Sequence, residues 1–276
     1  MHVLGVDFTS RPRQRKAITC VHAKFSEQTL HADRIERLED FAAFAQLLAR
    51  PGAWVGGFDL PFSLPRALVA QLGWPLEWRS LVVQVARLSR AEFRDLLDEV
   101  RRARPSGSKY LHRATDLPAG SSSPMKLVNP PVALMFYEGA PRLSASGVTV
   151  FPCAEGDPAR IALEAYPGML ARRITRRSYK AEAIAEQTRA RSSARGEILR
   201  ALLARARELL GFEVKLHHAI ERAARLDGSG DVLDALLCAC QAAWGYARRS
   251  RRYGLPARVD ALEGWIVGAL PGEDRR

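Results

Sequence analysis

The chain has 276 residues, 47% of them hydrophobic, which is typical of a globular protein with a substantial core. No apolar run approaches the roughly 20 residues of a membrane span, and the N-terminus begins with a predicted strand rather than a signal peptide, so we expect no membrane association and a cytoplasmic location. The four cysteines form no Cys-x-x-Cys pair, so neither a zinc site nor a local disulfide is expected.

The charge is strongly positive, with 42 Lys and Arg against 30 Asp and Glu and a net charge of +12. A field of this sign favours polyanions, and nucleic acid is the commonest polyanion. A compositional preference for arginine is the alternative explanation, because arginines greatly outnumber lysines. We therefore expect nucleic acid, DNA or RNA, as the partner.

The first part of the chain predicts strands around one helix. Three extended segments with short connections favour an antiparallel meander, at residues 3–8, 17–25 and 29–37. Apolar residues at helical spacing follow, from Leu38 to Leu48. Residues 53–59 then predict a buried, Gly-containing strand, and the two prolines of 60–65 prevent that strand from continuing.

The rest of the chain predicts mainly helices. One is expected over 78–88, and Ser89 with Glu92 forms a capping box that opens another. Residues 104–131 are rich in Ser, Gly, Pro and basic residues, which predicts a functional flap or a partly disordered, flexible insert. The later elements are expected as helix, strand, strand and three helices, at 132–137, 148–151, 160–166, 198–210, 214–226 and 231–248. Residues 263–270 either add a last strand or cover the core.

This order of elements predicts one α/β domain over residues 1–276. No internal repeat or clear linker divides the chain. A three-strand antiparallel meander, then parallel strands, helices and helical insertions, matches the ribonuclease-H-like fold. Its mixed sheet, flanked by helices, carries a metal site where the central strands end.

Carboxylates occur inside apolar segments at four places in the sequence. An unpaired charge in such surroundings costs several kcal/mol of desolvation, so a cation or a hydrogen-bond donor must meet each one. We expect these acids to converge on one site that binds a divalent metal: Asp7, Asp59, Glu164 and the pair Asp231 and Asp234.

Each acid also has a structural explanation. Asp7 could cap the turn that follows its strand, and Asp59 could form an Asx turn. Alternation along the strand puts Glu164 on the face opposite its apolar neighbours, where an arginine could pair with it. Asp231 suits the positive end of a helix dipole. Asp234 lies deeper in the helix, so it is the stronger candidate of that pair.

The chemistry that suits these acids is phosphodiester hydrolysis. Mg²⁺ prefers carboxylate oxygens, and two such ions about 4 Å apart activate water and stabilise the leaving oxygen. We expect Mg²⁺ or Mn²⁺ as the cofactor, with four ligand candidates: Asp7, Asp59, Asp231 and Asp234. No His-Glu-x-x-His, Gly-x-Ser-x-Gly or Walker A motif occurs, which argues against a zinc hydrolase, a serine hydrolase or a P-loop enzyme.

Basic residues accompany the candidate site. Lys180 is expected to neutralise charge in the transition state, and an ordinary surface lysine is the simpler alternative. Four further basic residues after the first strand are expected to contact a phosphate backbone, with a solvated hairpin tip as the alternative: Arg11, Arg13, Arg15 and Lys16.

Several short segments resemble domain-of-unknown-function family 429. They run in the family's order over nearly the whole chain: Gly5-Val-Asp-Phe-Thr-Ser10, Phe58-Asp-Leu-Pro-Phe-Ser-Leu-Pro65, Glu164-Ala-Tyr-Pro-Gly168, Ser178-Tyr-Lys180, Asp231-Val-Leu-Asp-Ala-Leu-Leu-Cys-Ala239 and Glu263-Gly-Trp-Ile266. That family is described as predicted nucleases of ribonuclease-H-like fold. The resemblance implies this fold and a metal site. The family's recurrent acids match Asp7, Asp59, Glu164 and Asp234, with Asp231 beside them, whereas the insert at 104–131 is not part of the pattern.

We therefore expect a divalent-metal-dependent nuclease. A non-catalytic nucleic-acid-binding module, in which the acids are structural, is the alternative from another class. A phosphotransferase of the same fold is less expected, because the chain has room for one copy of the fold and Arg-Pro-Arg rather than glycines follows the first strand.

Overall fold

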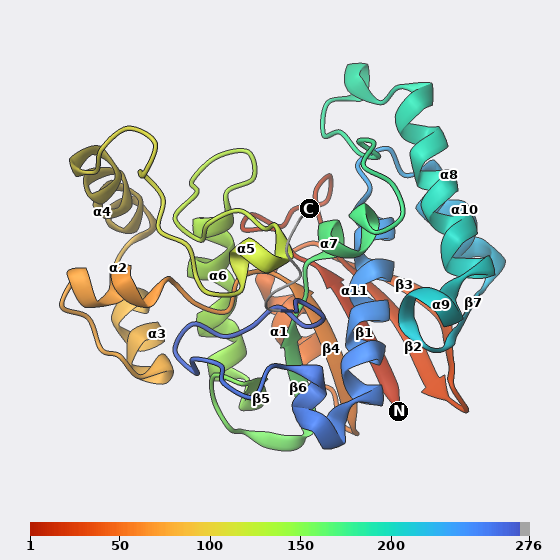
Figure 1. Ribbon diagram of the computed structural model, residues 1–276, viewed down its shortest axis with the longest axis horizontal. Helices are drawn as coiled ribbons and strands as arrows, with labels where there is room; N and C mark the ends of the chain where they lie inside the picture. Colours follow the sequence, from red (N-terminus) through yellow and green to blue (C-terminus); the bar gives the residue numbers. More distant parts are fainter. Residues whose placement is uncertain (271–276) are drawn as a thin grey trace.

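The computed structural model describes residues 1–270 as an α/β fold built on a seven-stranded mixed sheet (Figure 1). The strand order is β5-β6-β4-β1-β2-β3-β7. Strand β2 runs antiparallel to both of its neighbours, and every other neighbouring pair is parallel. The strands are β1 (His2–Asp7), β2 (Ile18–Ser26), β3 (Thr29–Leu38), β4 (Trp54–Asp59), β5 (Val148–Phe151), β6 (Asp157–Glu164) and β7 (Glu213–Leu216).

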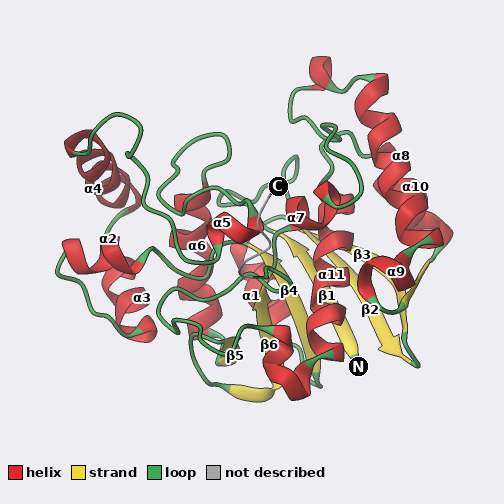
Figure 2. Cartoon of the chain, in the orientation of Figure 1, coloured by secondary structure: helices red, strands yellow, loops and turns green. Residues whose placement is uncertain are grey.

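Helices cover both faces of the sheet, and Figure 2 shows them in red on either side of the strands. In chain order, the helices before β5 are α1 (Phe41–Leu48), α2 (Arg66–Gln71), α3 (Trp78–Ala86), α4 (Arg90–Ala103), α5 (Asp116–Ala119) and α6 (Val132–Ala145). The helices after β6 are α7 (Pro167–Arg172), α8 (Arg189–Ala204), α9 (Ala206–Leu210), α10 (His218–Leu226) and α11 (Asp231–Ala247), with the 3₁₀ turns η1 (Ile184–Glu186) and η2 (Arg249–Gly254).

The two faces of the sheet belong to two hydrophobic cores, as the alternation of a strand requires. On β1, Val3 packs into the core that contains α8, α10 and α11. Leu4 and Val6 pack into the other core, with α1, α3 and α6. Asp7 has the same parity as Val3, so its side chain belongs to the α11 face.

Helix α11 lies directly on the central strands β1 and β4 (Figure 1). Glycines permit this close approach. A Cβ on Gly5 of β1 would lie 2.0 Å from the carbonyl oxygen of Ala235, and one on Gly57 of β4 would lie 2.3 Å from the carbonyl oxygen of Cys238. These contacts fix the height and position of the helix over the strand ends.

The predicted meander, the helix after it, the strand ending at Asp59 and the final helix are confirmed. The helix predicted over 214–226 is wrong in its first part, because Glu213–Leu216 form β7 and pair with β3. Four residues are too few for alternation to distinguish a strand from the helix that follows it. The helix predicted over 198–210 divides at Arg205 into α8 and α9.

Two remaining segments pack against the sheet. The insert at 104–131 differs from the predicted flexible segment in its middle, where it forms α5 and buries Arg113, Thr115 and Asp116. The predicted tail segment 263–270 covers the core: Ile266 bridges to Glu164 of β6. Within residues 1–270, no helix is long and apolar enough to cross a membrane.

The contact between α11 and β1 predicts that Gly5→Ala lowers the free energy of unfolding by about 3 kcal/mol, because the new methyl group must push the helix away. Urea titration followed by circular dichroism measures this. Gly196→Ala in α8 is the matched control, because the nearest atom to the new Cβ would be Nη1 of the flexible Arg200 side chain, at 3.3 Å. The free energy of unfolding of this variant should be unchanged or slightly higher. Equal stability of the two variants would contradict the packing argument.

Candidate metal centre

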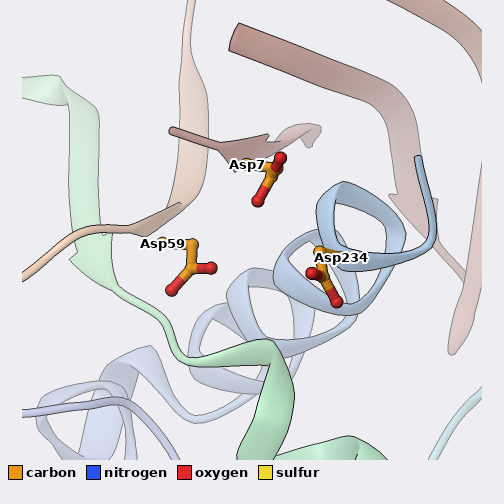
Figure 3. A group of neighbouring side chains, drawn as sticks. All are labelled: Asp7, Asp59 and Asp234. Carbon is orange, nitrogen blue, oxygen red and sulfur yellow. The ribbon is translucent and has the colours of Figure 1, made fainter. Parts of the chain in front are cut away.

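Three aspartates gather at the carboxyl ends of the central strands. Asp7 ends β1, Asp59 ends β4 and Asp234 lies in the first turn of α11 (Figure 3). One carboxylate oxygen of each lies within 4.8 Å of those of the other two. This convergence agrees with the expectation for the same three residues.

The sheet and the helix explain why these three side chains meet. Strands β1 and β4 are parallel neighbours, and Asp7 pairs with Asp59 in the register, so both carboxylates lie at one level on one face. That face is the one covered by α11. The close glycine contacts bring the first turn of the helix, and with it Asp234, over the ends of both strands.

Asp234 is engaged by the segment that follows α7. The hydroxyl of Tyr179 donates a hydrogen bond to its Oδ1 at 2.6 Å. The ammonium of Lys180 donates to its Oδ2 and forms an ion pair. Lys180 therefore contacts the candidate centre, and its role in neutralising charge in the transition state stays a prediction. Tyr179 was not among the predicted residues, although it precedes Lys180 in a motif that the sequence analysis selected.

Asp7 and Asp59 have no such partner. Among residues 1–270, neither carboxylate forms an ion pair or accepts a hydrogen bond. Burial raises the pKa of Asp7 well above its usual value, and the charges of Asp231 and Asp234 raise it further. Burial and the charge of Asp234 raise the pKa of Asp59 to about 7, although Lys180 opposes this change. One buried and one half-buried acid thus share a site with too little positive charge.

A divalent cation fits this donor set. Its ligands would be carboxylate oxygens from separate rigid elements, the arrangement that Mg²⁺ and Mn²⁺ accept. Within the described part of the chain, no histidine or cysteine belongs to the cluster, which disfavours zinc. A cation held by Asp7, Asp59 and Asp234 would relieve their mutual repulsion and supply the charge that Lys180 alone does not provide.

Asp231 lies outside this cluster. It belongs to the same helix turn, but its Oδ1 accepts a hydrogen bond from Lys16 Nζ at 3.0 Å. Lys16 also pairs with Glu182, at 2.5 Å. Asp231 therefore has its own cation. The contact of Lys16 with a phosphate backbone stays a prediction.

Glu164 is held away from the three aspartates. In the register of β4 and β6 it pairs with Phe58, so it belongs to the sheet face opposite Asp59. There it receives two hydrogen bonds from the guanidinium of Arg113, at 2.6 and 2.8 Å, and both side chains are only 2% exposed. The arginine pairing, left open by the sequence, is the arrangement observed.

Arg113 links the insert to the sheet. The same guanidinium donates to Asp116 Oδ1 at 2.9 Å and to the carbonyl oxygen of Glu263 at 3.1 Å. The guanidinium is the shared cation of two buried carboxylates, so removing it would leave both of them without their ion-pair partner. No sequence signal distinguished Arg113 from Arg104, the other arginine of the insert.

The remaining predicted basic residues lie at the surface. Arg11, Arg13 and Arg15 are exposed and do not line the cavity over the aspartates. Arg13 pairs with Lys16 in a short antiparallel bridge, which forms a hairpin tip. Their contact with phosphate stays a prediction.

A cavity of about 430 Å³ opens above the aspartates. It is lined by Asp7 and Asp59, by Lys16 and Lys180, and by residues of the insert and of the segment after α7. A volume of this size is within the range of small-molecule sites.

Comparisons of this chain with protein-family models, with curated proteins and with solved structures found no match. The resemblance to family 429 therefore stays a prediction.

The raised pKa of Asp59 makes stability depend on pH. Its folded-state pKa of about 7 exceeds the ordinary value of 3.8, so the folded state holds the proton more tightly, and stability falls as the pH rises between these values. Without divalent metal, the free energy of unfolding of wild type should fall by about 2 kcal/mol more than that of Asp59→Asn when the pH rises from about 5 to about 7. Urea titrations in EDTA at both pH values measure this. If the free energies of unfolding of the two proteins differ by the same amount at both pH values, the raised pKa of Asp59 is wrong.

The separation of Glu164 from the aspartates predicts opposite behaviour of two similar variants. Glu164→Gln should lower the free energy of unfolding by about 1 kcal/mol, because it weakens the buried hydrogen bonds with Arg113, which keeps Asp116 as its partner, and should leave Mn²⁺ affinity unchanged. Asp59→Asn should abolish Mn²⁺ binding without that loss of stability. Calorimetric titration and thermal melting separate the two. Loss of Mn²⁺ binding in Glu164→Gln with normal melting would assign Glu164 to the metal.

Proposed function

We propose that this protein is a hydrolase of nucleic-acid phosphodiester bonds that depends on Mg²⁺ or Mn²⁺. The observation that carries this proposal is the cluster of Asp7, Asp59 and Asp234, whose carboxylate oxygens lie within 4.8 Å of one another. Two of these acids, the buried Asp7 and the half-buried Asp59, are unpaired, which is costly unless a cation binds. When bound, the cation would make water a nucleophile at neutral pH and would stabilise charge on the phosphoryl oxygens.

The protein's own side chains have distinct roles in this proposal. Asp7 and Asp59, fixed by neighbouring parallel strands, hold the cation. Asp234 shares it and is oriented by the Tyr179 hydroxyl, which donates at 2.6 Å. Lys180 contacts Asp234 and lines the cavity, so its ammonium can shift towards a phosphate oxygen when the cation takes over the carboxylate.

The topology supports the proposal. The antiparallel meander β1–β2–β3, with the parallel strands β4 and β6 beside β1, is compatible with a ribonuclease-H-like arrangement. The acids lie at the carboxyl ends of its central strands. The resemblance to family 429, described as predicted nucleases, points to the same fold and activity.

The charge of the chain supports a polyanionic substrate. The net charge is +12, and the cavity that contains the aspartates is also lined by six basic residues: Lys16, Arg113, Arg172, Arg176, Arg177 and Lys180. Cations around a carboxylate centre attract phosphates that the acids alone would repel.

The direct test is metal-dependent cleavage. Purified protein with Mn²⁺ should cleave labelled DNA or RNA oligonucleotides, and Asp7→Asn should reduce the rate at least about 100-fold because the cation loses a ligand. Asp33→Asn, an exposed aspartate of β3 outside the cluster, is the control and should keep full activity. Gel analysis of single- and double-stranded substrates measures both variants.

Two outcomes would reject the proposal. In one, DNA and RNA of every form stay intact with Mn²⁺ or Mg²⁺. In the other, Asp7→Asn changes neither Mn²⁺ affinity nor cleavage. Salt-sensitive nucleic-acid binding that persists in EDTA, without cleavage, would favour the non-catalytic binding module instead.

A further inference from the structure

The cavity above the aspartates has two chemically different sides. One side is formed by the insert and the start of α6, and the other by α7 and the segment after it. In Figure 1 these two parts of the chain flank the upper ends of the strands. Asp7 and Asp59 line the cavity between these two sides, and Asp7 is only 9% exposed.

The side next to α6 is apolar. Pro131, Val132 and Met135 line it and lie within the first turn of the helix, at spacings of three and four residues that bring side chains to one face. All three are half-buried, and Pro130 extends the surface outward. No charged residue belongs to this stretch, so it suits a flat, uncharged group rather than a phosphate.

The opposite side is basic, and two of its arginines have no carboxylate partner among the described residues. Among residues 1–270, Arg172 donates only to the hydroxyl of Tyr166 and to two carbonyl oxygens, those of Ala119 and Gly120, and not to a carboxylate. Arg176 is exposed and has no hydrogen bond or ion pair with any residue of the described part of the chain. The other cations of the cavity each contact an acid, as Lys180 contacts Asp234. Two guanidinium groups are thus available for phosphates.

We infer that the cavity takes one unpaired nucleotide of a single strand, its base against Pro131, Val132 and Met135 and its phosphates between the aspartates and the two arginines. This inference rests on the proposed function and adds the class of substrate. A nucleotide has one uncharged face and one anionic side, which matches the division of the cavity. Contact of bases with apolar and aromatic side chains, next to basic grooves, is the usual mode of single-strand recognition.

The shape of the site argues against a duplex. Each base pair presents two joined bases and two sugars as one rigid unit, which is too large for a cavity of about 430 Å³. A single strand can turn one base outward and bring its phosphate to the centre at small cost.

Fluorescence anisotropy tests the inference with Ca²⁺ in place of Mn²⁺, so that binding is measured without turnover. The probes are oligothymidine and oligouridine of about 12 nucleotides, a blunt duplex of equal length and free thymidine monophosphate. Both single strands should bind at least about tenfold more tightly than the duplex. They should also bind more tightly than the mononucleotide, which engages fewer cations.

Matched variants locate the binding. Arg176→Ala should weaken single-strand binding about fivefold and reduce its salt dependence by about one counterion. Arg173→Ala is the control, because Arg173 is also exposed but lines a small separate cavity beside Trp244. Met135→Ala should weaken binding about fivefold through loss of contact with the base. Val83→Ala, an exposed site on α3, should not change it. Thermal melting confirms that the variants fold.

The outcomes separate the inference from the proposed function. If the duplex or the mononucleotide binds as tightly as the single strands, or if Arg176→Ala and Arg173→Ala behave alike, the inference is wrong. Cleavage of blunt duplex with Mn²⁺ at the single-strand rate would also overturn it and would leave the hydrolase intact. Variant-sensitive single-strand binding without any cleavage would support the nucleotide site and reject the hydrolase.

Discussion

Repulsion between like charges, imposed by rigid packing, is the constraint on which the candidate centre depends. Two parallel strands fix Asp7 and Asp59 at one level, and the helix that lies against Gly5 and Gly57 adds a third acid. None of these elements can retreat without opening a core. The repulsion must therefore be relieved by protons, as the raised pKa values of Asp7 and Asp59 indicate, or by a bound cation.

The other acids around the centre are each balanced by a specific cation. Lys16 pairs with Asp231, and Arg113 pairs with Glu164. Lys180 contacts Asp234, and at longer range its charge only partly offsets the rise in the pKa of Asp7 and Asp59. Positive charge is abundant in this chain, yet it is withheld from the innermost pair of aspartates. That distribution distinguishes a ligand site from an ordinary network of ion pairs, in which every charge has a partner.

Much of this arrangement follows from the sequence. The meander, the strand before Asp59 and the final helix are set by local patterns, and acids inside apolar elements identified the three aspartates that meet. Glu164 shows the limit, because its role depends on the pairing of β6 with β4, and only that register assigns it to the opposite face. Arg113 and β7 were missed for the same reason: partners distant in the sequence determine them.

The guanidinium of Arg113 has a consequence for how ligands enter. It joins the insert to β6 and to the carbonyl oxygen of Glu263, so one side of the cavity is anchored to the sheet before any ligand binds. A wall that is already ordered loses little conformational entropy upon association. The ligand should therefore bind to a preformed site. Selectivity should arise because ligands of the wrong shape do not fit, and not because a loop folds around the bound ligand.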